Sequence, residues 1–396
     1  MKLCQRDRTG QEMRNMKPVA AAGAVLAGLA LAGTSLAAAP SASASAVPES
    51  AAVIKGEFNA VSVASPANAW AVGCSIPDSD LCASDLADHW NGKTWTRVAV
   101  PSPAGSFGAD VGLTSVTDIS STDAWAIGTT EGGGNYVQIV HWNGKSWSQA
   151  TAPSIGLYGK QYGLDAISAV SATNIWAAGS IGGDALVLHW NGKAWSHVSV
   201  PLDSAEYVSG ITSVKAISAS DVWAVGSVTA EATELEAPLI LHWNGKSWTR
   251  MQSPKLLVGG DSGLTAVAGS SATNVWAVGL GDANTAIQLH WNGKSWSNET
   301  YRGSLPTPGF GYELRGVETT SSSRAWAAAC CGRALYWNGK KWSPTQIGTT
   351  SEDYEFQALA GATSSSVWAA AWFVNSSGNY VAVILHWNGK TWTRSV

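Results

Sequence analysis

The chain of 396 residues is long enough for two or three ordinary domains or for one large all-β domain. It contains 22 Trp and 42 Gly, and only 13% of its residues are charged, a composition that excludes a disordered chain, a coiled coil and a nucleic-acid-binding arm. The formal net charge of −4 offers no electrostatic argument for binding nucleic acid or an acidic membrane.

The N-terminal segment has the pattern of a secretory signal peptide. Five basic side chains fall within residues 1–17, and an apolar, Ala-rich run leads to small residues that suit cleavage near Ala39 or Ala46. An uncleaved membrane anchor is the alternative, although the run is short for a bilayer span. We expect residues 1–46 to be removed and residues 47–56 to form a short linker. The secreted chain, which loses five cations and two anions, then has a net charge of −7 and no membrane association.

Residues 57–396 contain seven copies of one unit. The motif His-Trp-Asn-Gly-Lys recurs every 46 to 53 residues, with Tyr for His in the sixth copy, and another Trp stands two residues after each Lys. A third Trp series lies within Trp-Ala-Val-Gly or close variants, so only Trp372 falls outside the three series. A fixed period near 50 residues indicates a repeat architecture. The units cover approximately residues 57–100, 111–150, 162–201, 209–251, 263–300, 312–345 and 355–396.

The second unit predicts four short strands and no helix. Alternating or compact apolar runs are separated by turn residues and a Gly-rich loop, and the expected strands cover residues 113–120, 124–128, 136–142 and 145–149. The first turn of a unit ends in Asp or Asn, which we interpret as Asx-turn residues: Asp123, Asn174, Asp221 and Asn274. Seven four-stranded units suit radial stacking. The predicted fold is therefore an all-β, seven-bladed β-propeller of four-stranded antiparallel blades.

The outer hairpin of each unit is predicted from its Asn-Gly pair. Asn-Gly between alternating runs favours a type I′ turn with positive φ at both central residues. In the second unit that register places Trp142 opposite Lys145 and makes Trp147 its diagonal neighbour, with the lysine stem over an indole. Each unit is complete in itself, so we expect no strand exchange between the termini and expect residues 47–56 to pack on the closing blade.

The repeats resemble those of the kelch family. The apolar strand that ends at Gly226 is similar to the kelch strand ending in glycine, and Leu-His-Trp-Asn-Gly-Lys-Ser-Trp at residues 289–296 is similar to the later kelch hairpin. The resemblance covers all seven units and implies a kelch-like, galactose-oxidase-type propeller. The same motifs also resemble secreted bacterial tandem-repeat propellers without an assigned activity. Kelch units have a Gly-Gly pair where this chain has one Gly, as at Gly128.

The connections from the second to the third strand, and from one unit to the next, vary in length and content. In a four-stranded meander they lie on one face of the propeller, and variable loops on a rigid scaffold are typical of binding sites. We place any ligand on this variable-loop face. The alternative is that these are solvated loops with a few anchoring aromatic residues. The candidate binding residues are Tyr158, Tyr162, Tyr207, Phe310, Tyr312, Arg315, Tyr354 and Trp372.

The repeated Trp and His residues have a structural interpretation. Paired indoles could serve as lectin-like sugar platforms, but buried indoles are the main apolar area of such thin sheets, so we favour the blade core. The histidines occur one per blade and cannot converge on one ion, which favours hydrogen-bonding roles and predicts no metal site. Apart from His197, no His of the secreted chain lies outside the repeat, so the copper site of galactose oxidase is not expected and no cofactor is predicted.

Four cysteines remain in the secreted chain. A Cys74–Cys82 disulfide would close the long loop of the first unit. Cys330 and Cys331 are adjacent, and the sequence is compatible with two alternatives for them, a strained vicinal disulfide or two free thiols.

The sequence favours an exported, non-catalytic binding module, a monomer that takes a glycan or protein ligand and no nucleic acid. An extracellular carbohydrate-active enzyme, whether an oxidase, a hydrolase or a lyase, is the alternative, and a purely structural surface protein is a third. A two-carboxylate hydrolase would draw on loop residues such as Glu206, Asp261, Glu313, Glu352 and Asp353.

Overall fold

The computed structural model consists of β-strands joined by turns and loops. The described residues lie in one compact unit, Ala44–Val396, and none of them belongs to a helix that could cross a membrane. They are residues 54–77, 81–101, 110–131, 136–153, 162–202, 206–256, 261–281, 285–301, 313–329, 332–347 and 354–396.

The strands form seven four-stranded antiparallel sheets, each built in chain order, and these are the blades of a β-propeller. Blades 1 and 2 are β1 (Gly56–Ser65), β2 (Asn68–Ser75), β3 (Ser84–Trp90), β4 (Trp95–Arg97), β5 (Asp110–Ser120), β6 (Asp123–Glu131), β7 (Tyr136–Trp142) and β8 (Trp147–Gln149). Blades 3 and 4 are β9 (Tyr162–Ser171), β10 (Asn174–Ile181), β11 (Asp184–Trp190), β12 (Trp195–His197), β13 (Glu206–Ser218), β14 (Asp221–Ala230), β15 (Glu236–Trp243) and β16 (Trp248–Arg250).

Blades 5 to 7 repeat the same order. They are β17 (Gly263–Ser271), β18 (Asn274–Gly281), β19 (Thr285–Trp291), β20 (Trp296–Asn298), β21 (Leu314–Ser321), β22 (Arg324–Ala329), β23 (Arg333–Trp337), β24 (Trp342–Gln346), β25 (Glu355–Thr363), β26 (Ser366–Val374), β27 (Tyr380–Trp387) and β28 (Trp392–Arg394). The predicted all-β propeller with seven blades is confirmed. The first strands of blades 1, 2 and 4 begin before the predicted repeat boundaries.

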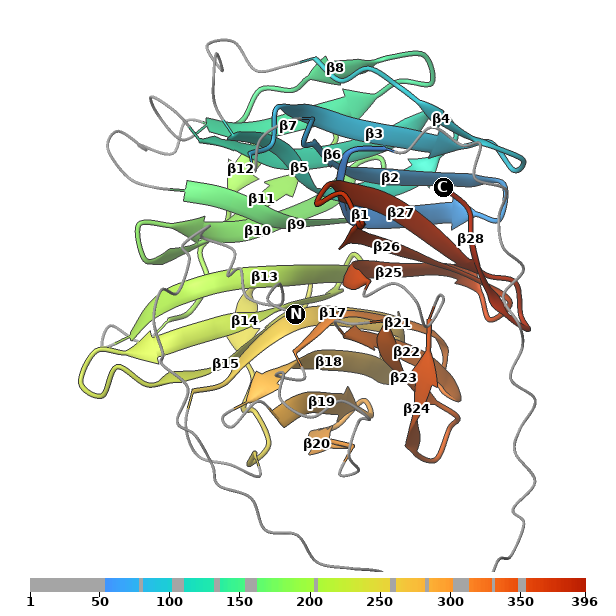
Figure 1. Cartoon of the computed structure of the whole chain (residues 1–396). Coiled ribbons are helices and arrows are strands. Elements are labelled where there is room, and N and C mark those ends of the chain that lie inside the picture. Colours follow the sequence, from blue (N-terminus) through green and yellow to red (C-terminus); the bar gives the residue numbers. More distant parts are fainter. Residues whose placement is uncertain are drawn as a thin grey trace, which may run out of the picture. The chain divides into compact units, whose positions relative to one another are not determined.

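The ring closes by packing and not by strand exchange. The first strands of successive blades contact one another, and β1 contacts β25, so blade 7 lies beside blade 1 (Figure 1). The backbone N–H of Ala382 donates to the carbonyl of Ile54 at 3.0 Å. Ile54 and Lys55 therefore pack on the closing blade as predicted, whereas residues 47–53 lie outside the described residues.

The hydrophobic core consists of seven clusters, and each spans the junction between two adjacent blades. The Trp of the second strand of one blade contacts both hairpin Trp of the next. Trp176 lies 4.9 Å from Trp243 and 5.3 Å from Trp248, with perpendicular edge contact to the latter. The last blade repeats the contact on the first, through Trp368 against Trp90 and Trp95. The interpretation of the repeated Trp as blade core is confirmed.

The glycine of Trp-Ala-Val-Gly is needed for close packing of the first two strands. A Cβ atom at Gly226 would lie 1.9 Å from the carbonyl oxygen of Gly210. The register of β13 and β14 shifts beside this contact, so the glycine accommodates a bulge in the inner strand.

The outer hairpin differs from its prediction. Trp142 pairs directly with Trp147, and residues 143–146 form a four-residue loop. The Asn143 side-chain oxygen accepts the backbone N–H groups of Lys145 and Ser146 at 2.9 and 3.1 Å, and only Gly144 has positive φ. The type I′ register is therefore wrong. Lys145 is exposed in the loop, and the predicted contact of its stem with an indole as a cross-strand neighbour is wrong as well.

Each repeat histidine is held within its own blade. In blade 2, His141 stacks on Trp125 at 4.3 Å, and its Nε2 bonds the Asp123 carboxylate at 2.9 Å. The turn itself is held by Ser120, whose hydroxyl accepts the N–H of Thr122, so the Asx-turn interpretation of Asp123 is corrected. The structural interpretation of the histidines is confirmed. Burial lowers the pKa of His89, His189, His290 and His386.

Candidate functional site

The variable-loop candidates fall into two groups. Tyr158, Phe310 and Tyr312 lie outside the described residues. Tyr162 and Tyr207 belong to β9 and β13, and their side chains also lie outside the described part. These five candidates stay predictions.

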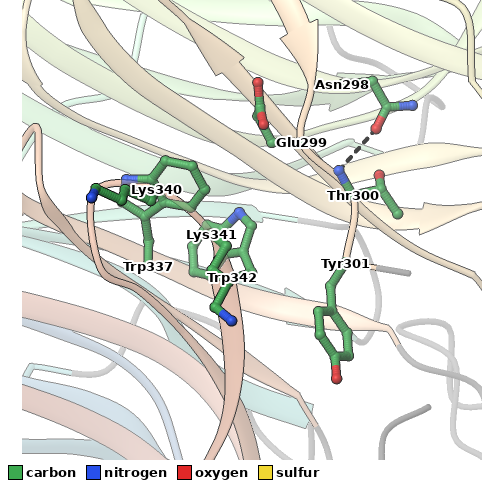
Figure 2. Close-up of a pocket in the computed structure, with 8 residues that line it drawn as sticks. All are labelled: Asn298, Glu299, Thr300, Tyr301, Trp337, Lys340, Lys341 and Trp342. Atoms are coloured by element: carbon green, nitrogen blue, oxygen red, sulfur yellow. Dashed lines mark hydrogen bonds between the residues drawn. The ribbon is translucent and has the colours of Figure 1, made fainter. Parts of the chain in front are cut away.

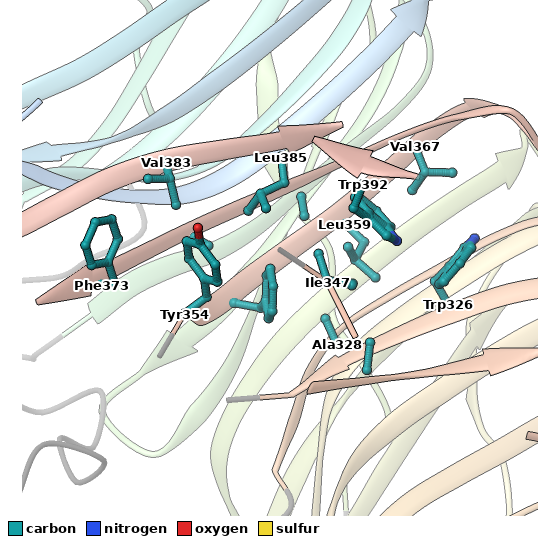
Figure 3. Packing of buried hydrophobic residues seen from close by; sticks show 14 of the residues in the cluster. Trp326, Ala328, Ile347, Tyr354, Leu359, Val367, Phe373, Val383, Leu385 and Trp392 are labelled. Atoms are coloured by element: carbon teal, nitrogen blue, oxygen red, sulfur yellow. The ribbon is translucent and has the colours of Figure 1, made fainter. Parts of the chain in front are cut away.

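Tyr354 is a core residue. Its side chain is 1% exposed and makes an edge contact with Phe373 at 5.7 Å, within the cluster between blades 6 and 7 (Figure 3). The prediction that it faces a ligand from a loop is therefore corrected. Burial of this ring is favoured because it adds a large apolar area to a junction between two thin sheets.

Trp372 and Arg315 also have structural partners. Trp372 lies within β26, paired with Glu355 and Ala382, and its ring is 5.3 Å from that of Tyr380. The assignment of Trp372 to a loop is wrong because β26 continues beyond the repeat motif. The Arg315 guanidinium donates to Glu313 at 2.9 Å and lies 3.6 Å from Glu355.

The carboxylates proposed for a hydrolase are engaged elsewhere. Glu206 pairs with Arg250, Asp261 accepts the backbone N–H of Glu236 at 3.0 Å, and Glu313 pairs with Arg315. Glu352 and Asp353 lie outside the described residues. No catalytic carboxylate pair emerges from the described part of the chain.

The Cys74–Cys82 disulfide is present, with a Cα–Cα distance of 5.4 Å. Glu57 lies within 4.8 Å of both sulfurs, but the bonded sulfurs offer no thiolate for a metal. Cys330 and Cys331 lie outside the described residues.

A pocket of about 440 Å³ opens at the junction between blades 5 and 6 (Figure 2). One wall is the hairpin of blade 6, which contributes two indoles and two exposed ammonium groups. The other wall is the segment that follows β20, where the backbone N–H of Thr300 donates to the Asn298 side chain at 3.0 Å. The lining residues are Asn298, Glu299, Thr300, Tyr301, Trp337, Lys340, Lys341 and Trp342.

The segment after the last strand of blade 5 differs in its side chains from the equivalent segments of other blades. At the junction of blades 3 and 4, Val198 and Val200 follow the last strand and pack against the cluster that contains Trp243 and Trp248. At other junctions the same role falls to Val98, Val100, Ala150, Ala152 and Met251. In blade 5, Glu299 and Tyr301 occupy the positions of Val198 and Val200, and the Tyr301 ring packs against the core cluster of its junction as Val200 does.

A second polar replacement lies directly behind this wall. Gln288 stands where blade 3 has Val187, and it is fully buried. Its side-chain oxygen accepts the N–H of Tyr301 at 2.6 Å, while its Nε2 has no hydrogen-bond partner among the described residues. An unpaired buried amide donor costs about 1–3 kcal/mol, a cost that Val187 avoids at the equivalent position of blade 3.

The pocket combines the groups that a saccharide site requires. Glu299, Asn298 and the Tyr301 phenol offer acceptors, Lys340 and Lys341 offer charged donors, and the partly exposed Tyr301 ring offers apolar surface, whereas Trp337 and Trp342 are only 8% and 4% exposed. Within the described residues neither lysine pairs with a carboxylate. Sequence reasoning missed this site because it treated all the repeat positions as structural, although Glu299 is the only charged residue at a position that is Val, Ala, Met, Thr or Ser in the other blades.

The comparisons identify the fold. No family model matches the sequence, and no curated protein matches it. YCF48 from Cyanidioschyzon merolae is 14% identical, with a TM-score of 0.53, over 85% of this chain and 97% of that one. The GH74 xyloglucanase of Xanthomonas campestris is 14% identical, with a TM-score of 0.57, over 87% of this chain and 55% of the enzyme.

A six-bladed fungal lectin from Aleuria aurantia is 12% identical, with a TM-score of 0.44, over 73% of this chain and 95% of the lectin. Likenesses at these identities establish the fold alone, so the kelch-like and galactose-oxidase-type relationship stays a prediction. By its blades and by these comparisons the chain is a seven-bladed β-propeller.

Proposed function

We propose that this propeller is an exported, non-catalytic glycan-binding protein whose binding site is the pocket between blades 5 and 6. The observation that carries the proposal is that Glu299 and the buried Gln288 stand where the junction of blades 3 and 4 has valines, beside Tyr301, which packs on the core and lines the pocket. The backbone there keeps the arrangement of the other junctions, since Glu299 donates to the Gln288 carbonyl at 2.9 Å just as Val198 donates to Val187. The two junctions therefore differ in their side chains and not in this backbone hydrogen bond.

A glycan suits this set of groups. Hydroxyl groups of a sugar pair with carboxylate, amide and ammonium groups, and the apolar face of a pyranose ring packs on aromatic side chains. Lys341 adds a cation where the other blades have Thr, Ser or Ala. The pocket therefore supplies both polar orientation and apolar contact.

The test is a glycan array probed with the secreted chain, followed by calorimetric titration of any saccharide that binds. The variant E299V/Y301V copies Val198 and Val200 and is expected to weaken binding by at least about tenfold while the fold stays intact. K341S is expected to weaken binding as well. K246S, which removes the exposed hairpin lysine of blade 4, is the matched control and should bind normally.

Two results would contradict the proposal. The first is an array without saccharide binding. The second is saccharide binding that survives E299V/Y301V but disappears in Y312A, which would place the site on the variable-loop face.

A further inference from the structure

Every blade presents an exposed lysine at the tip of its outer hairpin. The hairpins share one geometry, with Trp paired to Trp and glycine at positive φ between them. The seven lysines are Lys93, Lys145, Lys193, Lys246, Lys294, Lys340 and Lys390, and all are exposed.

The fold accounts for the other recurring polar residues of the hairpin. In blade 3, His189 stacks on Trp176 and bonds Asn174, Asn191 accepts two backbone N–H groups, and Ser196 donates to the His189 carbonyl at 3.4 Å. Lys193 contributes only its backbone N–H to the turn. Any residue except proline would supply that bond.

The lysine side chains take no part in holding the described turns together. Among the described residues, none of the seven ammonium groups forms a hydrogen bond or an ion pair. The following position varies among Thr, Ser, Ala and Lys, so the hairpin tip tolerates substitution. Seven lysines out of seven, in a chain with only 13% charged residues, therefore indicate a use outside the fold.

The seven lysines lie around the rim of one face. Within a blade the outer hairpin packs on the first turn, because a Cβ atom at Gly144 would lie 2.9 Å from Thr122. Between blades, Thr117 and Ser168 accept the N–H groups of Ala169 and Ala216 at 3.1 and 3.0 Å, so the inner strands are aligned. Equivalent turns of all seven blades therefore end at the same face.

Positive charge is concentrated on this face. Arg324 and Lys341 add to the seven lysines. Among the described residues near the first turns, the carboxylates are Asp118, which bonds Asn68, and Asp123 and Asp221, which bond His141 and His242. Because the secreted chain has a net charge of −7, the rest of it is more acidic than that total indicates. The net charge of the whole chain does not reveal that positive charge is concentrated on one face.

We propose that the lysine rim binds a linear acidic polysaccharide that carries a carboxylate on each sugar residue. A chain that follows the rim can contact several lysines in turn, and many weak contacts add through multivalency. An anionic membrane is disfavoured because it would also approach Asp123 and Asp221, which lie inside the rim. The rim is separate from the proposed saccharide pocket except at Lys340.

The experiment measures binding of the secreted chain to immobilised polygalacturonate, with neutral dextran as the control polymer. The variant K93Q/K145Q/K193Q/K390Q neutralises four lysines on blades 7, 1, 2 and 3 and leaves the pocket untouched. Binding is expected to fall by about tenfold or more, because each lysine near an anionic surface contributes separately. The four Lys→Arg substitutions at the same positions are expected to retain binding. Salt at roughly 0.5 M, which shortens the distance over which charges attract one another, is expected to abolish binding.

Equal binding by the Gln and wild-type chains would overturn the proposal. Loss of binding in the Arg variant, or binding to phosphatidylglycerol vesicles without binding to polygalacturonate, would also overturn it. The two sites are distinguishable, since E299V/Y301V should keep polygalacturonate binding and the Gln variant should keep saccharide binding in the pocket.

Discussion

The junction of blades 3 and 4 and the junction of blades 5 and 6 share a backbone and differ in their side chains. In both, the residue after the last strand donates its N–H to the third strand at 2.9 Å, and a second-strand Trp packs on two hairpin Trp. Val198 and Val200 cover the first junction, whereas the second has Glu299 and Gln288 in place of valines and keeps an apolar contact through Tyr301. The repeat thus provides a frame in which a few substitutions convert a packed junction into a pocket.

The largest expected difference concerns the hairpin Trp. Trp248 and Trp342 are both 4% exposed and make equivalent contacts. Trp248→Ala is expected to lower the free energy of unfolding by about 3–5 kcal/mol because it leaves a closed cavity. Trp342→Ala should cost at least about 1 kcal/mol less, since its space joins an open pocket that water can fill. Urea denaturation of both variants measures the difference, and equal losses would contradict the comparison.

Placing a glutamine at the equivalent position of blade 3 should reproduce the loss of stability that the buried amide causes. Val187→Gln places the Gln288 side chain at the apolar junction, where Val200 holds the position of the Tyr301 backbone donor and the side-chain amide N–H groups are left without a partner among the described residues. The free energy of unfolding is expected to fall by about 1–3 kcal/mol. The reverse change, Gln288→Val, removes an unpaired donor but also the acceptor for Tyr301, so its effect should stay within about 1 kcal/mol. An unchanged free energy of unfolding in Val187→Gln would contradict this difference between the two junctions.

The smallest expected effect is on histidine titration. Burial lowers the pKa of His189 and His290, and Glu299 partly offsets this for His290. Because the folded pKa lies below the unfolded value of 6.5, stability is present above that pH and is lost as the pH falls through the folded pKa. Glu299→Val should lower the His290 pKa further and leave His189 unchanged. NMR titration measures both, and a raised His290 pKa would contradict the placement of Glu299.

The sequence predicted the blades because three Trp series and a glycine repeat at one phase. The hairpin register was missed because the Asn143 side chain accepts two backbone N–H groups and lengthens the loop. Trp372 was misplaced because β26 extends past its motif. The pocket depends on which side chains face one junction, a property that emerges only when blades are set side by side.

The central claim is that the pocket between blades 5 and 6 binds a saccharide. The most direct measurement is NMR of assigned indole N–H signals during titration with a saccharide selected on the array. Shifts are expected at Trp337 and Trp342, while the equivalent Trp243 and Trp248 stay unchanged. Shifts at Trp243 and Trp248 of the same size, or no shift at Trp337 and Trp342 when the saccharide is bound, would contradict it.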